Sequence, residues 1–232
     1  MKICVINYSG NVGKSIISQH LLKPRLEDAE IIAVESINFD GSLDEKIKGK
    51  NFTKIINRAL SYDNAIIDVG ASNVEDFLQQ MKKSIGSHED MDLFVVPTTN
   101  KKKQIIDTIN TIQALQTMGI EKSRIKVIFN MVDDDTDYQF EFGDIFDIQS
   151  LAIVDECLSI QESELFDRLG ESNELLTITE LAQDATDYKK LIAESDNQID
   201  RLNFANALGL KRLAVGVERM LNITFEHLIS KQ

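Results

Sequence analysis

Short apolar runs alternate with longer amphipathic segments along most of the chain. The apolar runs hold almost no polar residues, which indicates strands buried on both faces, as in a parallel sheet covered by helices. Between the runs, apolar residues recur every three or four positions, the spacing of one helix face. Strict alternation of the two patterns predicts the α/β class, with helices on both faces of a parallel sheet. We expect strands at 2–7, 31–35, 64–68, 92–97 and 125–130, a short sixth at 151–154, and helices at 14–22, 52–60, 74–85 and 101–118.

The last third of the chain follows a different pattern. Residues 133–147 are rich in aspartate and aromatic side chains, and we interpret them as a solvated loop that binds a partner or acts as a lid. From about residue 161 onward the pattern is helical, and residues 202–228 predict a long helix, or a helix pair broken near Gly209. We therefore divide the chain into a nucleotide-binding α/β domain at 1–158 and a helical C-terminal extension at 159–232, packed on or next to it.

Composition narrows the class of partner. A chain of 232 residues with 43% hydrophobic residues fits one globular α/β domain with an extension. The net charge of −13 disfavours direct DNA binding, which rests on phosphate neutralisation by Lys and Arg.

We expect a cytoplasmic protein without membrane contact, because the start does not resemble a secretory signal and no stretch approaches the ~20 apolar residues of a membrane span. Cys4 and Cys157 form neither a metal motif nor a disulfide framework.

The segment between the first strand and the first helix carries the strongest chemical signal. Gly10 and Gly13 allow the backbone to approach an anion closely, and the helix N-terminus supplies N–H donors. Lys14 would reach the β- and γ-phosphates of a nucleotide, and the Ser15 hydroxyl would bind magnesium. The expected nucleotide contacts are Ser9, Gly10, Asn11, Val12, Gly13, Lys14, Ser15 and Ile16.

This loop resembles that of a known family. Tyr8 stands where the common motif G-x-x-x-x-G-K-[ST] has its first glycine. The loop is instead similar to the deviant Walker A sequence of the ParA/MinD ATPases, K-G-G-x-G-K-[ST], and matches it at Gly10 and at 12–15. Ser9 replaces the lysine that reaches the partner's nucleotide in family dimers, and Asn11 replaces a glycine. Together with residues 33–38, the opening resembles the plasmid stability StbB-type branch, and the likeness covers roughly residues 2–154.

The resemblance implies further site residues and a P-loop NTPase-like fold. Asp68 matches the Walker B aspartate, which holds Mg²⁺ through water, and the N–H of Gly70 would sense a γ-phosphate. Glu35 ends the second strand where the family has an acidic residue, whereas Ile37 stands in place of a water-aligning aspartate. The expected catalytic residues are Lys14, Glu35 and Asp68, and the expected magnesium contacts are Ser15 and Asp68.

Asn130 ends the fifth predicted strand, where the family has an asparagine that contacts the adenine edge. The resemblance therefore implies ATP with Mg²⁺. Because residues 130–133 are weakly similar to the guanine-reading motif N-K-x-D, with Met131 in place of its lysine, GTP stays open.

Three functions are consistent with these residues. The leading hypothesis is an ATP-binding and weakly hydrolysing switch protein in plasmid stability, partition or DNA positioning, which dimerises with ATP and meets a protein partner such as a DNA-binding adaptor. The second is a nucleotide-binding adaptor with negligible hydrolysis, motivated by Ser9 and Ile37. The third is a small-molecule kinase or an ATP-dependent ligase of the dethiobiotin or cobyrinic-acid type, which share the loop. ATP-dependent dimerisation, phosphate release and phosphate transfer to a metabolite separate the three.

Overall fold

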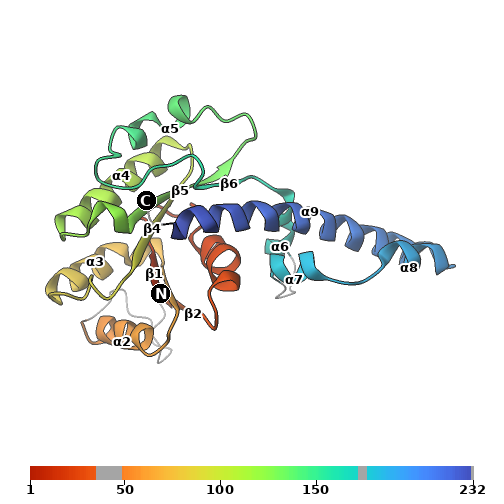
Figure 1. The fold of residues 1–232 in the computed structure, drawn as a ribbon, viewed down its shortest axis with the longest axis horizontal. Coiled ribbons are helices and arrows are strands. Elements are labelled where there is room, and N and C mark those ends of the chain that lie inside the picture. The colour runs from red at the N-terminus through yellow and green to blue at the C-terminus, as the bar shows by residue number, and fades with distance from the viewer. Residues whose placement is uncertain (35–48, 172–176, 231–232) are drawn as a thin grey trace.

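A single parallel sheet forms the centre of the molecule (Figure 1). The computed structural model describes residues 1–34, 49–171 and 177–230. Six strands lie in the order β2-β3-β1-β4-β5-β6, and every neighbouring pair is parallel. The chain winds from β1 to one side through β2 and β3, then crosses to the other side at β4. The strands are β1 Lys2–Val5, β2 Glu30–Val34, β3 Ala65–Val69, β4 Leu93–Thr98, β5 Ile125–Val132 and β6 Ser159–Gln161.

Helices and short helical turns connect the strands. Those within the α/β part are α1 Lys14–Ile16, the π-helical segment η1 Ile17–Leu22, the turns η2 Lys23–Arg25, η3 Ala71–Asn73 and η4 Lys122–Arg124, and the helices α2 Gly49–Leu60, α3 Val74–Lys83, α4 Lys102–Thr117 and α5 Tyr138–Phe146. The C-terminal helices are α6 Glu164–Glu171, α7 Ile178–Gln183, α8 Tyr188–Glu194 and α9 Gln198–Ile229. Among the described residues, no helix combines the length and the apolar character needed to cross a membrane.

Two apolar cores lie on opposite faces of the sheet, because successive strand residues point to opposite sides. One core joins the sheet to α2, α3, α4 and α5, with Phe52, Phe77 and Phe142 fully or almost fully buried. The other joins the sheet to η1 and to the second half of α9, through Leu21 and Leu221 among others. Helices on both faces and an all-parallel sheet confirm the predicted fold class.

The long helix α9 combines two environments. Its second half packs on the sheet with Ala214, Val217, Leu221, Phe225 and Leu228 buried. Its first half runs away from the sheet beside α8 (Figure 1). The helix continues through Gly209, so the expected alternative of a helix pair is wrong. Strand β6 lies just beyond residue 158, and the proposed division at that residue stays a prediction.

Two further expectations about the C-terminal third need correction. The sixth strand is at Ser159–Gln161 and not at 151–154, where Ile153 forms only an isolated bridge with Lys126. The acidic and aromatic segment 133–147 is not a solvated loop throughout, because α5 occupies its second half. Phe142 and Ile145 are buried there, and Phe142 and Phe146 pack against Phe129 of β5 with ring centroids 4.6 and 5.6 Å apart.

Candidate functional site

The expected phosphate loop follows β1 and leads into α1 at the carboxyl edge of the sheet. Strand β1 lies between β3 and β4, and the chain winds outward in opposite directions on its two sides. Ligands of open α/β sheets bind in the crevice at such a switch point, outside the carboxyl ends of the strands. The sheet therefore places loop 9–15 where the fold favours a ligand.

The loop backbone adopts conformations suited to an anion. Gly13 has φ of 86° and Asn11 has φ of 56°, the left-handed region that glycine enters freely and asparagine tolerates. Among the described residues, no hydrogen bond has an amide of residues 10–15 as its donor. Val12 is fully buried, Gly13 and Ile16 are half-buried, and Gly10, Asn11 and Ser15 are exposed. The loop thus offers a set of N–H donors to a ligand.

Lys14 lies over the loop that it would serve. Its ammonium donates to the carbonyl of Ser9 at 2.7 Å and to that of Asn7 at 3.2 Å, and its side chain is buried. Burial lowers the pKa of Lys14, and the nearby charge of Asp68 offsets part of this effect. Binding to a phosphate would give this cation a stronger acceptor than two neutral carbonyls.

Asp68 and Ser15 supply oxygen ligands near Lys14. Asp68 sits in β3 opposite Val5 of β1 and is largely buried. Oxygen ligands of this kind suit Mg²⁺, which usually keeps several waters and binds through few protein groups plus phosphate. Among the described residues, no group of three or more His, Cys, Asp or Glu side chains could hold a metal ion by itself. Oxygen donors of this kind fit a magnesium nucleotide, and the roles of Ser15 and Asp68 as its contacts stay predictions.

Asn130 holds the phosphate loop from the end of β5. Its Nδ2 donates to the carbonyl of Val12 at 3.1 Å, and the side chain is buried. A β-carbon on Gly13 would lie 2.0 Å from this nitrogen. In this conformation Asn130 contacts the loop itself, and its predicted contact with adenine stays a prediction.

Ser9 and Gly70 are both engaged within the chain. Ser9 is 4% exposed, its N–H donates to Asn7 Oδ1 at 2.7 Å, and its carbonyl accepts from Lys14. The N–H of Gly70 donates to the carbonyl of Val34 at 2.9 Å. To sense a γ-phosphate, this amide would have to leave the Val34 carbonyl. Glu35 and Ile37 lie outside the described residues.

Several residues that shape the loop were missed by the sequence analysis. Asn7 is fully buried and donates at 2.7 Å both to the carbonyl of Pro97 and to Thr108 Oγ1. Gln104 Nε2 donates to the carbonyls of Gly10 and Asn11 at 3.2 and 3.3 Å. The one signal for this role in the sequence is the helical spacing of Gln104, Thr108 and Thr111, which fall beside the apolar residues of the same helix.

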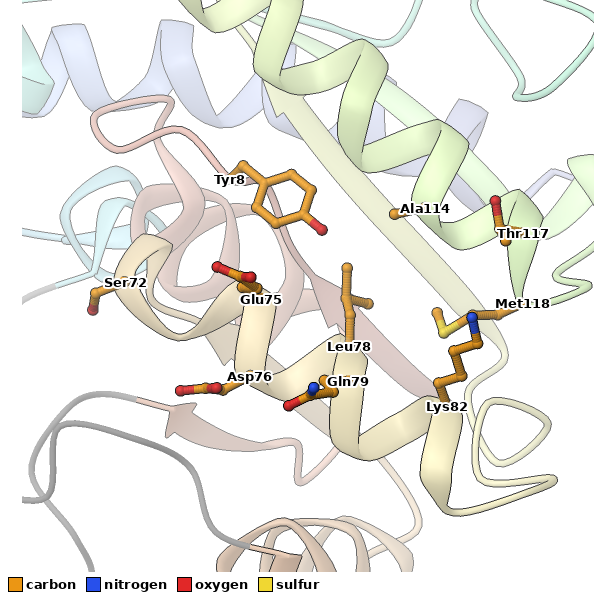
Figure 2. Close-up of a pocket in the computed structure, with 10 residues that line it drawn as sticks. All are labelled: Tyr8, Ser72, Glu75, Asp76, Leu78, Gln79, Lys82, Ala114, Thr117 and Met118. Carbon is orange, nitrogen blue, oxygen red and sulfur yellow. The ribbon is translucent and has the colours of Figure 1, made fainter.

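A groove of about 620 Å³ adjoins the loop (Figure 2). Tyr8 lies between α3 and α4, with Glu75 and Leu78 of α3 on one side and, on the other, Ala114 of α4 and Met118 just after it. Burial of the ring, and secondarily the charge of Glu75, raise the pKa of Tyr8. The groove therefore lies between the two helices beside Tyr8, the residue that precedes loop 9–15.

Comparison with known proteins shows which solved structures share this fold. The sequence matches no protein-family model, and no curated protein matches it. Among solved structures, a chain of the MinC:MinD cell division complex of Aquifex aeolicus is similar, with 15% identity, a TM-score of 0.56, and coverage of 95% of each chain. The pNOB8 ParA structure has 11% identity and a TM-score of 0.53, over 97% of this chain and 98% of that chain.

A third similar structure is the ATP complex of a McdA variant from Cyanothece, with 14% identity and a TM-score of 0.51, over 90% of this chain and 96% of that chain. These likenesses extend over almost the whole chain, including the C-terminal helices. The protein therefore has the P-loop α/β fold of the ParA/MinD ATPases.

Proposed function

We propose that this protein binds ATP, or GTP, together with Mg²⁺ through loop 9–15 and acts as a nucleotide switch of the ParA/MinD kind. The observation that carries the proposal is the joint placement of Lys14, Asp68 and the donor-rich loop at the switch point of the sheet. Magnesium at Ser15 and Asp68 would neutralise phosphate charge. The chain's own residues would bind and orient the phosphates, and Lys14 would neutralise the γ-phosphate.

The proposed biological role is plasmid stability, partition or DNA positioning. The solved structures named above support it through their shared fold, because they include MinD and ParA. We propose that the nucleotide-bound form pairs with a second copy and holds a protein partner, and that hydrolysis releases them. With a net charge of −13, a DNA-binding adaptor is a better partner than DNA itself.

The experiment is nucleotide binding with Mg²⁺ by titration calorimetry, with phosphate release and sizing-column elution recorded on the same samples. The proposal predicts saturable binding, slow phosphate release and an ATP-dependent shift to a dimer. A chain that binds no nucleotide would contradict the proposal.

A nucleotide-binding adaptor with negligible hydrolysis is the second candidate. The observation that favours it is the burial of Ser9, a residue that is only 4% exposed and whose carbonyl is held by Lys14. A serine so placed does not provide the cation that the family lysine brings to a partner's nucleotide. Tight ATP binding without phosphate release would select this candidate.

A metabolite kinase or ATP-dependent ligase is the third candidate. The groove at Tyr8 favours it, because polar side chains line a cavity beside the residue that precedes the phosphate loop. Labelled γ-phosphate that ends on a small molecule and not on water would select this candidate over the switch.

A further inference from the structure

Helix α4 presents a line of buried polar side chains to residues 7–11, which include the start of the phosphate loop. Gln104, Thr108 and Thr111 are each about one helical turn apart and lie on one face of α4. All three are buried. Buried polar groups are costly unless they are hydrogen-bonded, so such a line has to have specific partners. Outside α4, the partners of Thr108 and Thr111 are Asn7 Nδ2 at 2.7 Å and the N–H of Tyr8 at 3.2 Å.

Gln104 is the member of this line that reaches the loop itself. Its Nε2 donates to the carbonyls of Gly10 and Asn11 at 3.2 and 3.3 Å. The other end of the amide, Oε1, accepts from the hydroxyl of Thr99, which is buried at the end of β4. The chemistry of the partners fixes the orientation of the amide, because backbone carbonyls only accept and therefore face the NH₂ group.

Holding a carbonyl also orients the next amide along the chain. A trans peptide is planar, and its N–H points opposite to its C=O. With the carbonyls of Gly10 and Asn11 directed toward Gln104, the N–H groups of Asn11 and Val12 are directed away from α4. Asn130 does the same for the N–H of Gly13, because it holds the carbonyl of Val12. The buried side-chain amides of Gln104 and Asn130 thus orient three consecutive N–H donors, at residues 11–13.

We propose that Gln104 is a positioning residue for phosphate binding, which pre-orients the N–H donors of Asn11 and Val12 by holding the carbonyls of the two preceding residues. The inference rests on the proposed nucleotide-binding function. Gln104 touches no phosphate itself and acts through the loop backbone, with its own amide oriented by Thr99. Such pre-orientation removes an ordering cost that a free loop would pay on binding.

The test compares Gln104→Leu with Gln113→Leu, the same substitution at an exposed position of the same helix. Titration calorimetry measures the Kd for Mg-ATP, and hydrogen–deuterium exchange measures protection of the amides of residues 10–15 without nucleotide. We expect Gln104→Leu to weaken ATP binding about tenfold, or about 1.4 kcal/mol, and to speed exchange in the loop. Gln113→Leu should change neither quantity.

Unchanged affinity in Gln104→Leu would overturn the inference, even if its Tm falls, because that result assigns Gln104 a structural role alone. Wild-type protein that binds no nucleotide would overturn the proposed function, and the inference with it. If Gln104→Leu does not fold, Thr99→Val replaces it, since this variant exchanges for a methyl group the hydroxyl that orients the amide and accepts a long hydrogen bond from the Lys101 N–H. We expect about threefold weaker ATP binding from Thr99→Val, or about 0.65 kcal/mol, and an unchanged Kd would again overturn the inference.

Discussion

The side-chain amide of Asn130 occupies the space that a β-carbon on Gly13 would need. An ideal Cβ at Gly13 would lie 2.0 Å from Asn130 Nδ2, and Gly13 has φ of 86°. Two independent constraints, one steric and one conformational, therefore demand glycine at this position of the loop.

Gly13→Ala should lower the free energy of unfolding by about 2 kcal/mol or more. The new β-carbon would collide with Asn130, and alanine would be strained in the left-handed backbone conformation of this position. Urea denaturation of the free protein measures the change. Gly10→Ala is the matched control, since a β-carbon there meets nothing within 4 Å. Equal stability of the two variants would show that the loop is not held against Asn130 as described.

Arg25 joins the helical segment after the phosphate loop to α9. Its Nη2 lies 2.9 Å from Glu218 Oε2, and the two side chains are only 8% and 16% exposed. Arg25→Met should cost about 3 kcal/mol of stability, because it leaves a poorly solvated carboxylate without its cation. Arg58→Met is the control, since the Arg58–Glu30 pair is 40% and 32% exposed, and it should cost about 0.5 kcal/mol. Thermal unfolding measured by circular dichroism compares them, and similar costs would argue against this link to α9.

Phe142 anchors α5 on β5. The side chain is fully buried, and its ring centroid lies 4.6 Å from that of Phe129. Phe142→Ala should lower the free energy of unfolding by about 3–5 kcal/mol through cavity formation. Phe140→Ala removes a ring that is 87% exposed in the same helix and should have almost no effect. If urea denaturation gave both variants wild-type stability, the segment would be the solvated loop that the sequence suggested.

The sequence was sufficient for the local features of the fold, and it indicated where a phosphate loop would lie. Strand runs and helix faces depend on nearby residues, and so does the phosphate loop, whose glycines, Lys14 and Ser15 are contiguous. The partners of the loop are not local, because Gln104 and Asn130 are 94 and 118 residues from the loop carbonyls they hold. The periodicity of apolar residues in a single sequence does not predict contacts between positions so far apart.

Two predictions for the C-terminal third were wrong for a different reason. The many aspartates of 133–147 suggested solvation, yet Tyr138, Phe142 and Phe146 recur at helical spacing and pack on Phe129. Strand β6 is short and partly polar, so the more apolar run at 151–154 looked like the better strand. In both cases the deciding contact is with β5, because α5 packs on the ring of Phe129 and β6 pairs with the edge of β5.

The stability of the free protein should carry a pH signature of Lys14. Burial lowers the pKa of Lys14 in the folded state below its ordinary value of 10.5. Between the lowered value and 10.5 the unfolded state binds more protons, so the free energy of unfolding rises with pH in that window. In Lys14→Met this contribution is absent. Urea denaturation of both proteins from pH 7 to about pH 10 should show wild type gaining stability relative to the variant, and parallel curves would contradict the described burial.

The most direct test of the central claim is the Kd for Mg-ATP of wild type, Lys14→Ala and Lys23→Ala, measured by titration calorimetry. Lys23 is an exposed lysine at the end of the same helical segment, so its variant loses the same charge without touching the loop. We predict saturable binding by wild type and Lys23→Ala, and at least about a hundredfold loss of affinity, or about 2.7 kcal/mol, in Lys14→Ala. Equal binding by all three proteins, or binding by none, would contradict a nucleotide site at this loop.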